Sequence, residues 1–215
     1  MRRLWGRLSS VNVQKAVWGL EELGLPYERV EAGGAFGRVR DPDYLAMNPN
    51  GLVPVLEEDG FVLWESNAIL RHLARGHEAH GLWPEDLRAA ALADQWLDWQ
   101  ATRFTPATRD AFWQTVRTPA DRRDQATIDR SVAASEECAA ILDAHLMGRA
   151  YMVGERFTVA DIAVAAATHR WLHLDVPRIE RPALRAWYAR VRERPAAAPS
   201  RIDSALASRA SGEGA

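Results

Sequence analysis

Along the first eighty residues, the spacing of apolar positions switches repeatedly between that of a strand and that of a helix. Apolar residues recur three and four positions apart from Val11 to Leu23, which predicts an amphipathic helix that ends at Gly24. Short apolar runs on either side of Glu58-Asp59-Gly60 predict a hairpin. The predicted strand, helix, strand, helical turn, hairpin and helix are Arg3–Gly6, Val11–Leu23, Tyr27–Val30, Asp43–Met47, 53–64 and Ser66–Arg75. This order predicts a small α/β unit.

After Pro84, strand-like spacing almost vanishes and the apolar positions follow helical periods. Helices packed on helices are the simplest architecture for such a stretch. The helices predicted here are Asp86 to about Val116, Arg122 to Leu146, Val159 to Leu172 and Ala183 to Arg194. A polar, glycine-bounded linker at 76–81 separates the two halves, so we predict an α/β domain over 1–77 and an all-helical domain over 86–200. Residues 201–215, rich in Ala, Ser and Gly, are expected to form a flexible tail.

Composition narrows the class of protein. With 47% hydrophobic residues, 26% charged residues and a formal net charge of −2, the chain is too apolar for intrinsic disorder and too neutral for a typical nucleic-acid binder. No apolar run approaches the roughly 18 residues of a membrane span, and no secretory signal opens the chain, which favours the cytoplasm. The only lysine is Lys15, and we attribute the excess of arginine to base composition.

Several Cys, His and Asp residues could suggest a disulfide, a metal site or a catalytic role, but their sequence surroundings favour structural roles. The single cysteine, Cys138, excludes an internal disulfide or a cysteine zinc cluster, and its helical surroundings predict a buried structural thiol. His169 and His173 stand four positions apart, but no pair of carboxylates accompanies them, so no metal is expected. Thr158 precedes Asp161 by three positions, close to a capping box, which indicates a folding role for Asp161.

Polar side chains cluster at the start of the first predicted helix, where Ser9, Ser10 and Asn12 follow the first strand. Each of them is typical of a plain helix cap, which satisfies the free backbone N–H groups. Three hydrogen-bonding side chains at the positive end of a helix also form a natural anion site. Both interpretations stay open on these residues alone.

Two further segments carry the same ambiguity. Pro54 interrupts an apolar run, so Val53-Pro54 is either an edge strand or bulge, or a cis bond that turns the backbone of Val53 toward a ligand. Ser66 is interpreted first as the cap of the next helix. Together, the Glu65 carboxylate and the Ser66 hydroxyl suit the ammonium and carboxylate of an α-amino acid end.

With these residues in place, the chain resembles the glutathione transferase family over about 190 residues, and most closely its serine-dependent theta- and zeta-type branch with their bacterial relatives. The segments that carry the resemblance are Ser9-Ser10-x-Asn12-Val13-x-Lys15, Glu21–Tyr27, Asn48–Leu56, Glu65–Leu70, Leu82-Trp83-Pro84, Asp94–Gln100 and Phe157–Ala163. The resemblance implies a thioredoxin-like N-terminal domain, an all-α C-terminal domain, a homodimer and glutathione as co-substrate without a metal.

The resemblance also implies roles for individual residues. Ser10 best matches the catalytic serine, Asn12 is a second donor to the sulfur, and Ser9 is the alternative if the register shifts by one. The glutathione site would include Leu52, Val53, Pro54, Glu65 and Ser66. Leu52 departs from the family pattern, since relatives commonly carry Lys, Arg or Gln there to hold the glycyl carboxylate. Loss of that charge would weaken glutathione binding by about 1–3 kcal/mol unless Arg38, Arg40 or another residue takes its place.

For the electrophile, we expect a pocket between the first loop and the long helix after the linker, with the candidates Leu8, Phe36, Arg103, Phe104, Ala107 and Trp113. Arg103 suits an anionic substrate or leaving group. The predicted activity is conjugation of glutathione thiolate to small hydrophobic electrophiles, typical of detoxification. The alternatives are a glutathione-dependent isomerase or dehalogenase, and a binding protein without turnover. A thiol oxidoreductase is disfavoured because residues 9 to 12 contain no cysteine.

Overall fold

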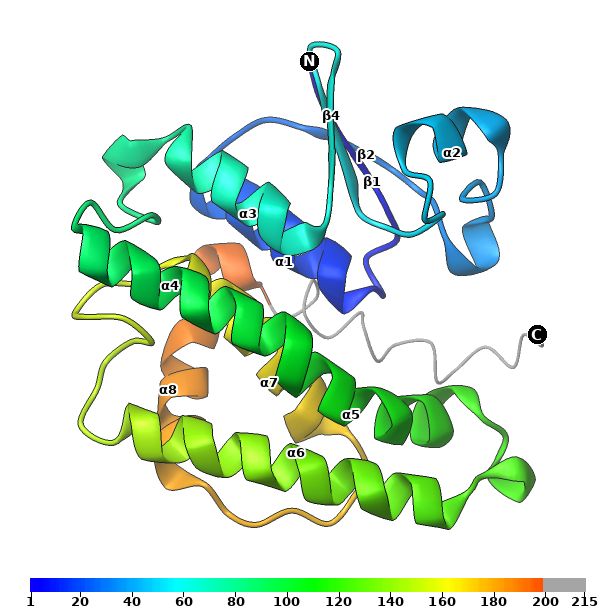
Figure 1. The fold of residues 1–215 in the computed structure, drawn as a ribbon, viewed down its shortest axis with the longest axis vertical. Helices are drawn as coiled ribbons and strands as arrows, with labels where there is room; N and C mark the ends of the chain where they lie inside the picture. Colours follow the sequence, from blue (N-terminus) through cyan, green and yellow to red (C-terminus); the bar gives the residue numbers. More distant parts are fainter. Residues whose placement is uncertain (199–215) are drawn as a thin grey trace.

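The computed structural model describes residues 1–198, which form a four-stranded sheet with three helices, followed by a bundle of longer helices (Figure 1). The strands are β1 (Arg2–Trp5), β2 (Glu28–Val30), β3 (Val55–Glu58) and β4 (Phe61–Trp64). The sheet order is β2-β1-β3-β4, in which β1 and β2 are parallel and the other pairs are antiparallel. The predicted α/β unit and its hairpin are confirmed.

The two faces of the sheet bury different cores, because successive side chains of a strand point to opposite sides. Leu4 and Leu56 lie in the main core, which also contains the apolar faces of α1 (Val11–Glu22) and α3 (Ser66–Arg75). Val55 lies in a smaller cluster on the other face, with Tyr44 of α2 (Pro42–Met47). The sheet therefore lies between α2 and the pair α1 and α3.

Helices α1 and α3 pack closely because Gly19 has no side chain. A Cβ at Gly19 would lie 2.7 Å from Cδ2 of Leu70, closer than packed atoms approach. This contact sets the two helices against each other and leaves the opposite side of α1 for the bundle. Buried residues of α1 and α7 belong to the same core, so the two predicted domains share one apolar interior.

The bundle consists of α4 (Leu87–Trp99), α5 (Thr105–Phe112), α6 (Gln125–Leu146), α7 (Val159–His173) and α8 (Pro182–Arg192). The helix predicted from Asp86 to Val116 is one helical run interrupted by two π-helical turns, η3 (Gln100–Phe104) and η4 (Trp113–Arg117). Short 3-10 turns occupy η1 (Gly34–Phe36), η2 (Glu78–His80), η5 (Ala120–Arg122) and η6 (Pro195–Ala197). The predicted tail 201–215 and the last two residues of the predicted helical domain lie outside the described residues.

Helix α7 occupies the centre of the bundle (Figure 1) and is buried along nearly its whole length. It packs against α1, α4, α5 and α8. Cys138 of α6 is 6% exposed, as predicted, and burial raises the pKa of its thiol, which keeps it protonated. In the part of the chain that the structure describes, no helix is long and apolar enough to cross a membrane.

The start of α7 is held by a buried carboxylate. Asp161 and Thr158 form the predicted capping box. The Asp161 carboxylate accepts the backbone N–H groups of Met152 at 2.8 Å and Thr158 at 2.9 Å, and the indole N–H of Trp187 at 2.9 Å. Asp161 thereby joins α7, α8 and the segment before α7, which confirms its folding role.

Asp161→Ala is expected to lower the free energy of unfolding by about 3 kcal/mol, because it leaves three buried donors unpaired. Urea unfolding followed by circular dichroism measures the change. The matched control is Asp129→Ala, whose carboxylate accepts an exposed bond from Gln125 and whose loss should change stability by less than about 0.5 kcal/mol. Equal effects of the two substitutions would contradict the role of Asp161.

Candidate functional site

The sheet register brings three chain segments to one edge. Trp5 pairs with Val55, and Val55 pairs with Trp64. Since β1 and β4 end at this edge and β3 begins there, the loop after β1, the turn before β3 and the start of α3 all lie together. These are the segments that carry the predicted residues Ser10, Val53 and Glu65.

The loop after β1 has a fixed backbone. Gly6 has φ of +152°, and a Cβ there would lie 2.4 Å from Cγ2 of Val13. The N–H of Gly6 donates to the carbonyl of Val30 at 2.8 Å, and the N–H of Arg7 donates to that of Ala32 at 3.0 Å. The entrance to α1 is thus tied to the strand beside it and to the loop that follows that strand.

Ser10 occupies the N-cap position of α1 with an extended backbone, but its side chain makes no cap hydrogen bond. The plain capping interpretation therefore does not describe its hydroxyl. Ser9, Ser10 and Asn12 are all partly buried at the positive end of the helix. The structure brings these three predicted residues together in the first turn of α1 and the loop before it.

The turn before β3 contains a cis peptide bond between Val53 and Pro54, so the predicted cis bond itself is confirmed. The carbonyl of Leu52 accepts hydrogen bonds from the Tyr44 hydroxyl and the Asn48 amide, both at 2.8 Å. The side chain of Leu52 is 63% exposed. The backbone of this turn is therefore held from behind, while the residue at position 52 faces outward.

Glu65 opens α3 with a positive φ of 70°. Its carbonyl accepts the first intrahelical bond, from the N–H of Ile69 at 2.9 Å. The prediction that Ser66 caps the helix is wrong, because the sharp change of direction after β4 falls on Glu65 and Ser66 is already helical. Ser66 is buried and Glu65 is exposed, both at the positive end of α3.

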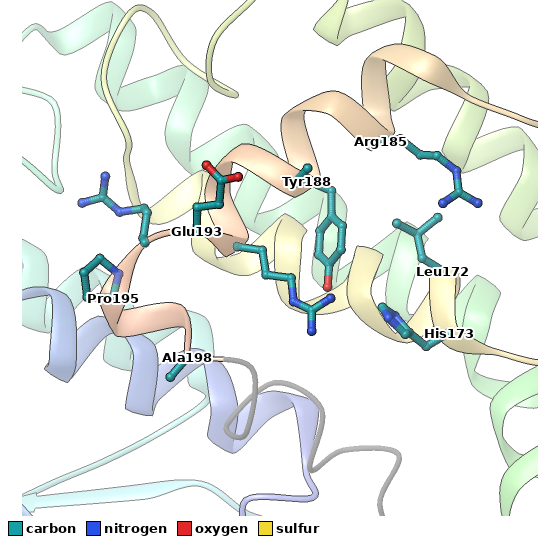
Figure 2. Close-up of a pocket in the computed structure, with 10 residues that line it drawn as sticks. Leu172, His173, Arg185, Tyr188, Glu193, Pro195 and Ala198 are labelled. Atoms are coloured by element: carbon teal, nitrogen blue, oxygen red, sulfur yellow. The ribbon is translucent and has the colours of Figure 1, made fainter.

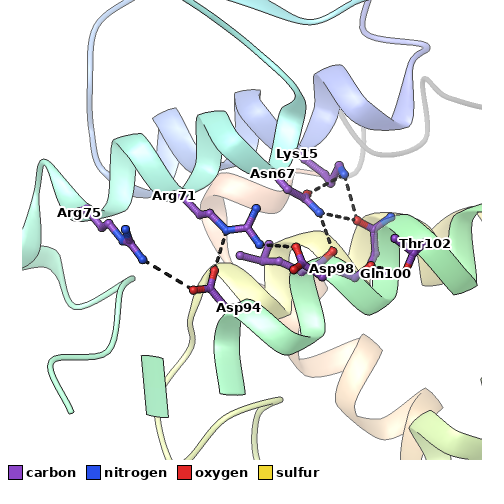
Figure 3. Close-up of polar contacts among 9 residues, drawn as sticks. Lys15, Asn67, Arg71, Arg75, Asp94, Asp98, Gln100 and Thr102 are labelled. Atoms are coloured by element: carbon purple, nitrogen blue, oxygen red, sulfur yellow. Dashed lines mark hydrogen bonds and ion pairs between the residues drawn. The ribbon is translucent and has the colours of Figure 1, made fainter. Parts of the chain in front are cut away.

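Behind these two helix starts lies a buried lysine (Figure 3). The Lys15 ammonium is 2% exposed and donates to Oδ1 of Asn67 at 2.8 Å and to Oε1 of Gln100 at 3.0 Å. The Asn67 amide in turn donates to the carbonyl of Leu97 at 2.7 Å. These contacts join α1, α3 and the junction of α4 with η3.

The same contact surface carries ion pairs between α3 and α4. Arg71 donates to Asp94 at 2.6 Å and to Asp98 at 2.5 Å, and Arg75 lies 3.7 Å from Asp94 (Figure 3).

Burial lowers the pKa of Lys15 to about 7, with the Glu65 charge acting in the opposite direction. The sequence marks Lys15 only as the single lysine and assigns it no role, and the structure supplies one. A lone lysine among apolar helix positions was the available signal.

The residues predicted to line the electrophile pocket differ in how far they are exposed. Leu8 and Ala107 are partly buried, and Phe36 and Trp113 are 52% and 60% exposed. Phe104 is fully buried against Trp99, with ring centroids 5.6 Å apart, so its assignment to an open pocket is wrong. Phe104 is the last residue of the π-helical turn η3 and belongs to the main core. Arg103 is exposed and acts electrostatically on Cys138 of α6.

A separate pocket of about 840 Å³ lies between α7 and α8 (Figure 2) and includes Tyr188, Arg185 and Arg194 but none of the predicted site residues. Arg185 forms an ion pair with Glu180, and Arg194 forms an ion pair with Glu22 at the end of α1. Nearby, Nδ1 of His169 lies 2.5 Å from the Tyr188 hydroxyl. Burial lowers the pKa of His169 to about 3, so the ring is neutral.

His169 and His173, the two histidines considered as metal ligands, both have hydrogen-bonding partners within the protein. Nδ1 of His173 lies 2.8 Å from the backbone carbonyl of His169. Within residues 1–198, no group of three or more His, Cys, Asp or Glu side chains gathers in a way that suits a metal ion.

Comparison with known proteins agrees with this arrangement. The family model for the glutathione S-transferase N-terminal domain matches residues 2–75, and that for the C-terminal domain matches residues 104–195. The chain belongs to the glutathione S-transferase family. Its sheet and helices therefore form the thioredoxin-like and all-helical parts of that family's fold.

Individual relatives support the assignment. The chain is 43% identical to glutathione S-transferase GstB of Escherichia coli over 198 residues, which is 91% of this chain and 95% of GstB. It is 31% identical to glutathione S-transferase 4 of Zea mays, with 91% and 89% covered. A theta class glutathione S-transferase from Xanthomonas axonopodis pv. citri, solved with glutathione bound, superposes with a TM-score of 0.91 at 44% identity, with 95% of this chain and 98% of that chain covered.

Lys15→Met is expected to remove a pH-dependent component of stability from this glutathione S-transferase. Between about pH 7 and the ordinary lysine pKa of 10.5, the unfolded chain holds a proton at Lys15 that the folded chain has lost. Stability therefore rises with pH in that window, by about 1.4 kcal/mol per unit from this group, and is lost as pH falls toward 7. Urea unfolding across the window, compared between wild type and variant, measures it.

Lys15→Arg is the control, since arginine keeps its charge throughout this window. Both variants should lack the rise, so the wild-type advantage should grow with pH against each. An advantage that is constant across the window contradicts a depressed pKa at Lys15.

Proposed function

We propose that the protein conjugates glutathione thiolate to small hydrophobic electrophiles, with Ser10 as the group that stabilises the thiolate, and that it acts as a cytoplasmic homodimer in detoxification. The observation that carries this proposal is the shared sheet edge, where the start of α1, the turn at Val53 and the start of α3 converge. These are the three segments needed to hold the sulfur, the cysteinyl backbone and the γ-glutamyl end of the tripeptide.

The residues at this edge fit the chemistry of glutathione. The Glu65 carboxylate suits the ammonium of the γ-glutamyl end, and the Ser66 hydroxyl with the first N–H groups of α3 suits its carboxylate. The backbone of Val53, beside the cis bond, would pair with the cysteinyl part. Pro54 keeps that backbone out of the β3 ladder because it has no N–H to donate.

Ser10 and the start of α1 supply the required stabilisation. A thiol with a pKa near 8.5 is only about 3% ionised at neutral pH. Lowering that pKa to about 6.5 requires roughly 2.7 kcal/mol of preference for the thiolate. One hydrogen bond to a charged acceptor contributes about 1.5–3 kcal/mol and a helix N-terminus about 0.3–2 kcal/mol. One hydroxyl and the helix therefore suffice, and Asn12 is a second donor.

Ser10→Ala is expected to raise the pKa of the bound thiol and to lower kcat by well over tenfold, because the donor to the sulfur is lost. The ultraviolet absorbance of bound thiolate, titrated against pH, reports the pKa, and conjugation of an aromatic halide reports turnover. Ser9→Ala is the matched control and should keep both. If the thiolate titrates unchanged in Ser10→Ala, Ser10 does not activate the sulfur, and a change in Ser9→Ala instead would move the role to Ser9.

The missing cation at position 52 has a candidate replacement. The guanidinium of Arg40 lies against Gly51, since a Cβ at Gly51 would be 3.0 Å from Nη1 of Arg40. Within the described residues, no carboxylate pairs with Arg40. Both arginines are exposed, and Arg38, whose backbone is left-handed with φ of 66°, is not among the groups nearest to Gly51. Arg40 is therefore the better placed of the two to meet the glycyl carboxylate.

Arg40→Ala is expected to raise the KM for glutathione about five- to tenfold with little change in kcat, because it removes a contact made equally before and during the reaction. Steady-state kinetics at saturating electrophile measure both constants. Arg38→Ala should leave them unchanged. An effect confined to Arg38→Ala assigns the carboxylate to Arg38, and no effect from either leaves the cation to another residue.

A homodimer is supported by exposed apolar side chains on β4 and α4. Phe61 and Trp64 of the edge strand β4 are 49% and 37% exposed, and Leu87 and Leu92 of α4 are 85% and 48% exposed. Helix α3 connects these elements, through the ring contact of Phe61 with His72 and the ion pairs from Arg71. Large apolar side chains exposed on these two elements favour association with a second copy.

A further inference from the structure

Three arginines from separate parts of the chain meet beside the start of α1. Arg7 belongs to the loop after β1, Arg117 ends η4 and Arg170 lies in α7. The guanidinium carbon of Arg170 lies 4.2 Å from the centroid of the Phe112 ring, and that of Arg117 lies 5.5 Å from the same centroid. Two cations thus share one aromatic ring.

Arg7 completes the group from the other side. Its guanidinium packs against the backbone of 33–34, where a Cβ on Gly33 would lie 2.8 Å from Nη1 of Arg7. Burial and the charge of Arg117 lower the pKa of Arg7. Burial, and after it the charges of Arg117 and Arg7, lower the pKa of Arg170 to about 10. The positive charges near Arg7 and Arg170 therefore add to the cost of burying these two guanidinium groups.

No acidic side chain offsets this cost at two of the three positions. Among residues 1–198, no carboxylate forms an ion pair with Arg7 or Arg170, and Nε of Arg170 is buried without a hydrogen-bond partner. Burying like charges together is costly unless a counter-charge is supplied. A bound anion would remove that cost and satisfy the unpaired donor.

The position of the cluster relates it to the proposed reaction. The carbonyl of Arg7 accepts the backbone N–H of Ser10 at 3.1 Å, so the two residues belong to one tight loop. Phe112 is buried beneath Arg117 and Arg170, and Trp113, the next residue in the chain, is 60% exposed. An anion held by the arginines would place the rest of its molecule next to the sulfur.

From this geometry we propose that the electrophile is an aromatic or otherwise apolar molecule that carries a carboxylate or sulfonate, held by Arg7, Arg117 and Arg170. This inference rests on the proposed function and assigns its substrate class. It also replaces Arg103, which lies toward α6, as the cation for an anionic substrate. Arginine suits the role because its planar fork matches carboxylate and sulfonate oxygens.

A chlorodinitrobenzoate illustrates the chemistry. The thiolate sulfur attacks the ring carbon that bears chlorine and forms the carbon–sulfur bond. The carbon–chlorine bond then breaks, and chloride leaves with the bonding electron pair. The thiol proton has already passed to solvent, so the step needs no base, oxidant or reductant. The carboxylate takes no part in the bond changes and serves only to anchor the ring.

The test compares this carboxylate with its methyl ester, which has the same leaving group and ring. Each kcat/KM is divided by the rate constant of the uncatalysed reaction with glutathione, which corrects for intrinsic reactivity. We expect the wild type to prefer the carboxylate by about tenfold or more, as for a charge-assisted hydrogen bond. Arg117→Gln and Arg170→Gln should each remove most of that preference, and Arg117→Lys should restore part of it.

Arg109→Gln is the matched control, because Arg109 is exposed on α5 and pairs with Asp110. It should keep the preference. Conjugation of both compounds at equal corrected rates, or a preference that survives in Arg117→Gln and Arg170→Gln, overturns the inference and leaves the transferase proposal standing.

Calorimetric titration with dinitrobenzoate, which lacks the leaving group, separates the two proposals. If neither chloride is conjugated, the proposed function fails, and the titration still decides the anion site. Binding of dinitrobenzoate that is weakened about tenfold in Arg170→Gln but not in Arg109→Gln supports the site. Absence of binding to the wild type, or equal binding by all variants, overturns it.

Discussion

The buried ammonium of Lys15 is the interaction on which the rest of the site depends. It bonds at once to an amide of α3 and an amide at the junction of α4 and η3, from a position one turn inside α1. A buried ammonium must be satisfied by acceptors, so each of these helices is held in place by the others. The helix that starts at Ser10 and the helix that starts at Glu65 are therefore positioned together with the first bundle helix behind them.

This arrangement gives the site two electrostatic regions. On the side of α3, the exposed Glu65 starts the helix, and Asn67 two positions later bonds to the buried Lys15. On the side of α7, the guanidinium groups of Arg7 and Arg170 approach each other without a carboxylate between them in the described chain. The helix start with Ser10 lies between the two regions. Under the proposed function, a negatively charged sulfur there would be favoured by the positive end of α1 and by the cations on the α7 side.

Much of the local structure was predictable because it depends on short-range patterns. The apolar spacing of α1, the hairpin around Asp59 and the capping box at Asp161 all follow from residues within a few positions of one another. The cis bond at Val53 was one of two open interpretations, since a proline in an apolar run permits both. Ser66 was misassigned as a cap by one residue, because the positive φ of Glu65 is set by the path from β4 into α3 and not by side-chain preference.

By itself, the sequence determined the order of helices and strands and the family, because both depend on local spacing and on motifs of consecutive residues. Only the tertiary structure decided which charges are buried and which face one another. Lys15, Gln100 and Asn67 are far apart in the chain, as are Arg7, Arg117 and Arg170, and Phe104, at the end of a π-helical turn, lies in the core. The energy of a charged group depends on its neighbours in space and on its distance from water, and a linear pattern records neither.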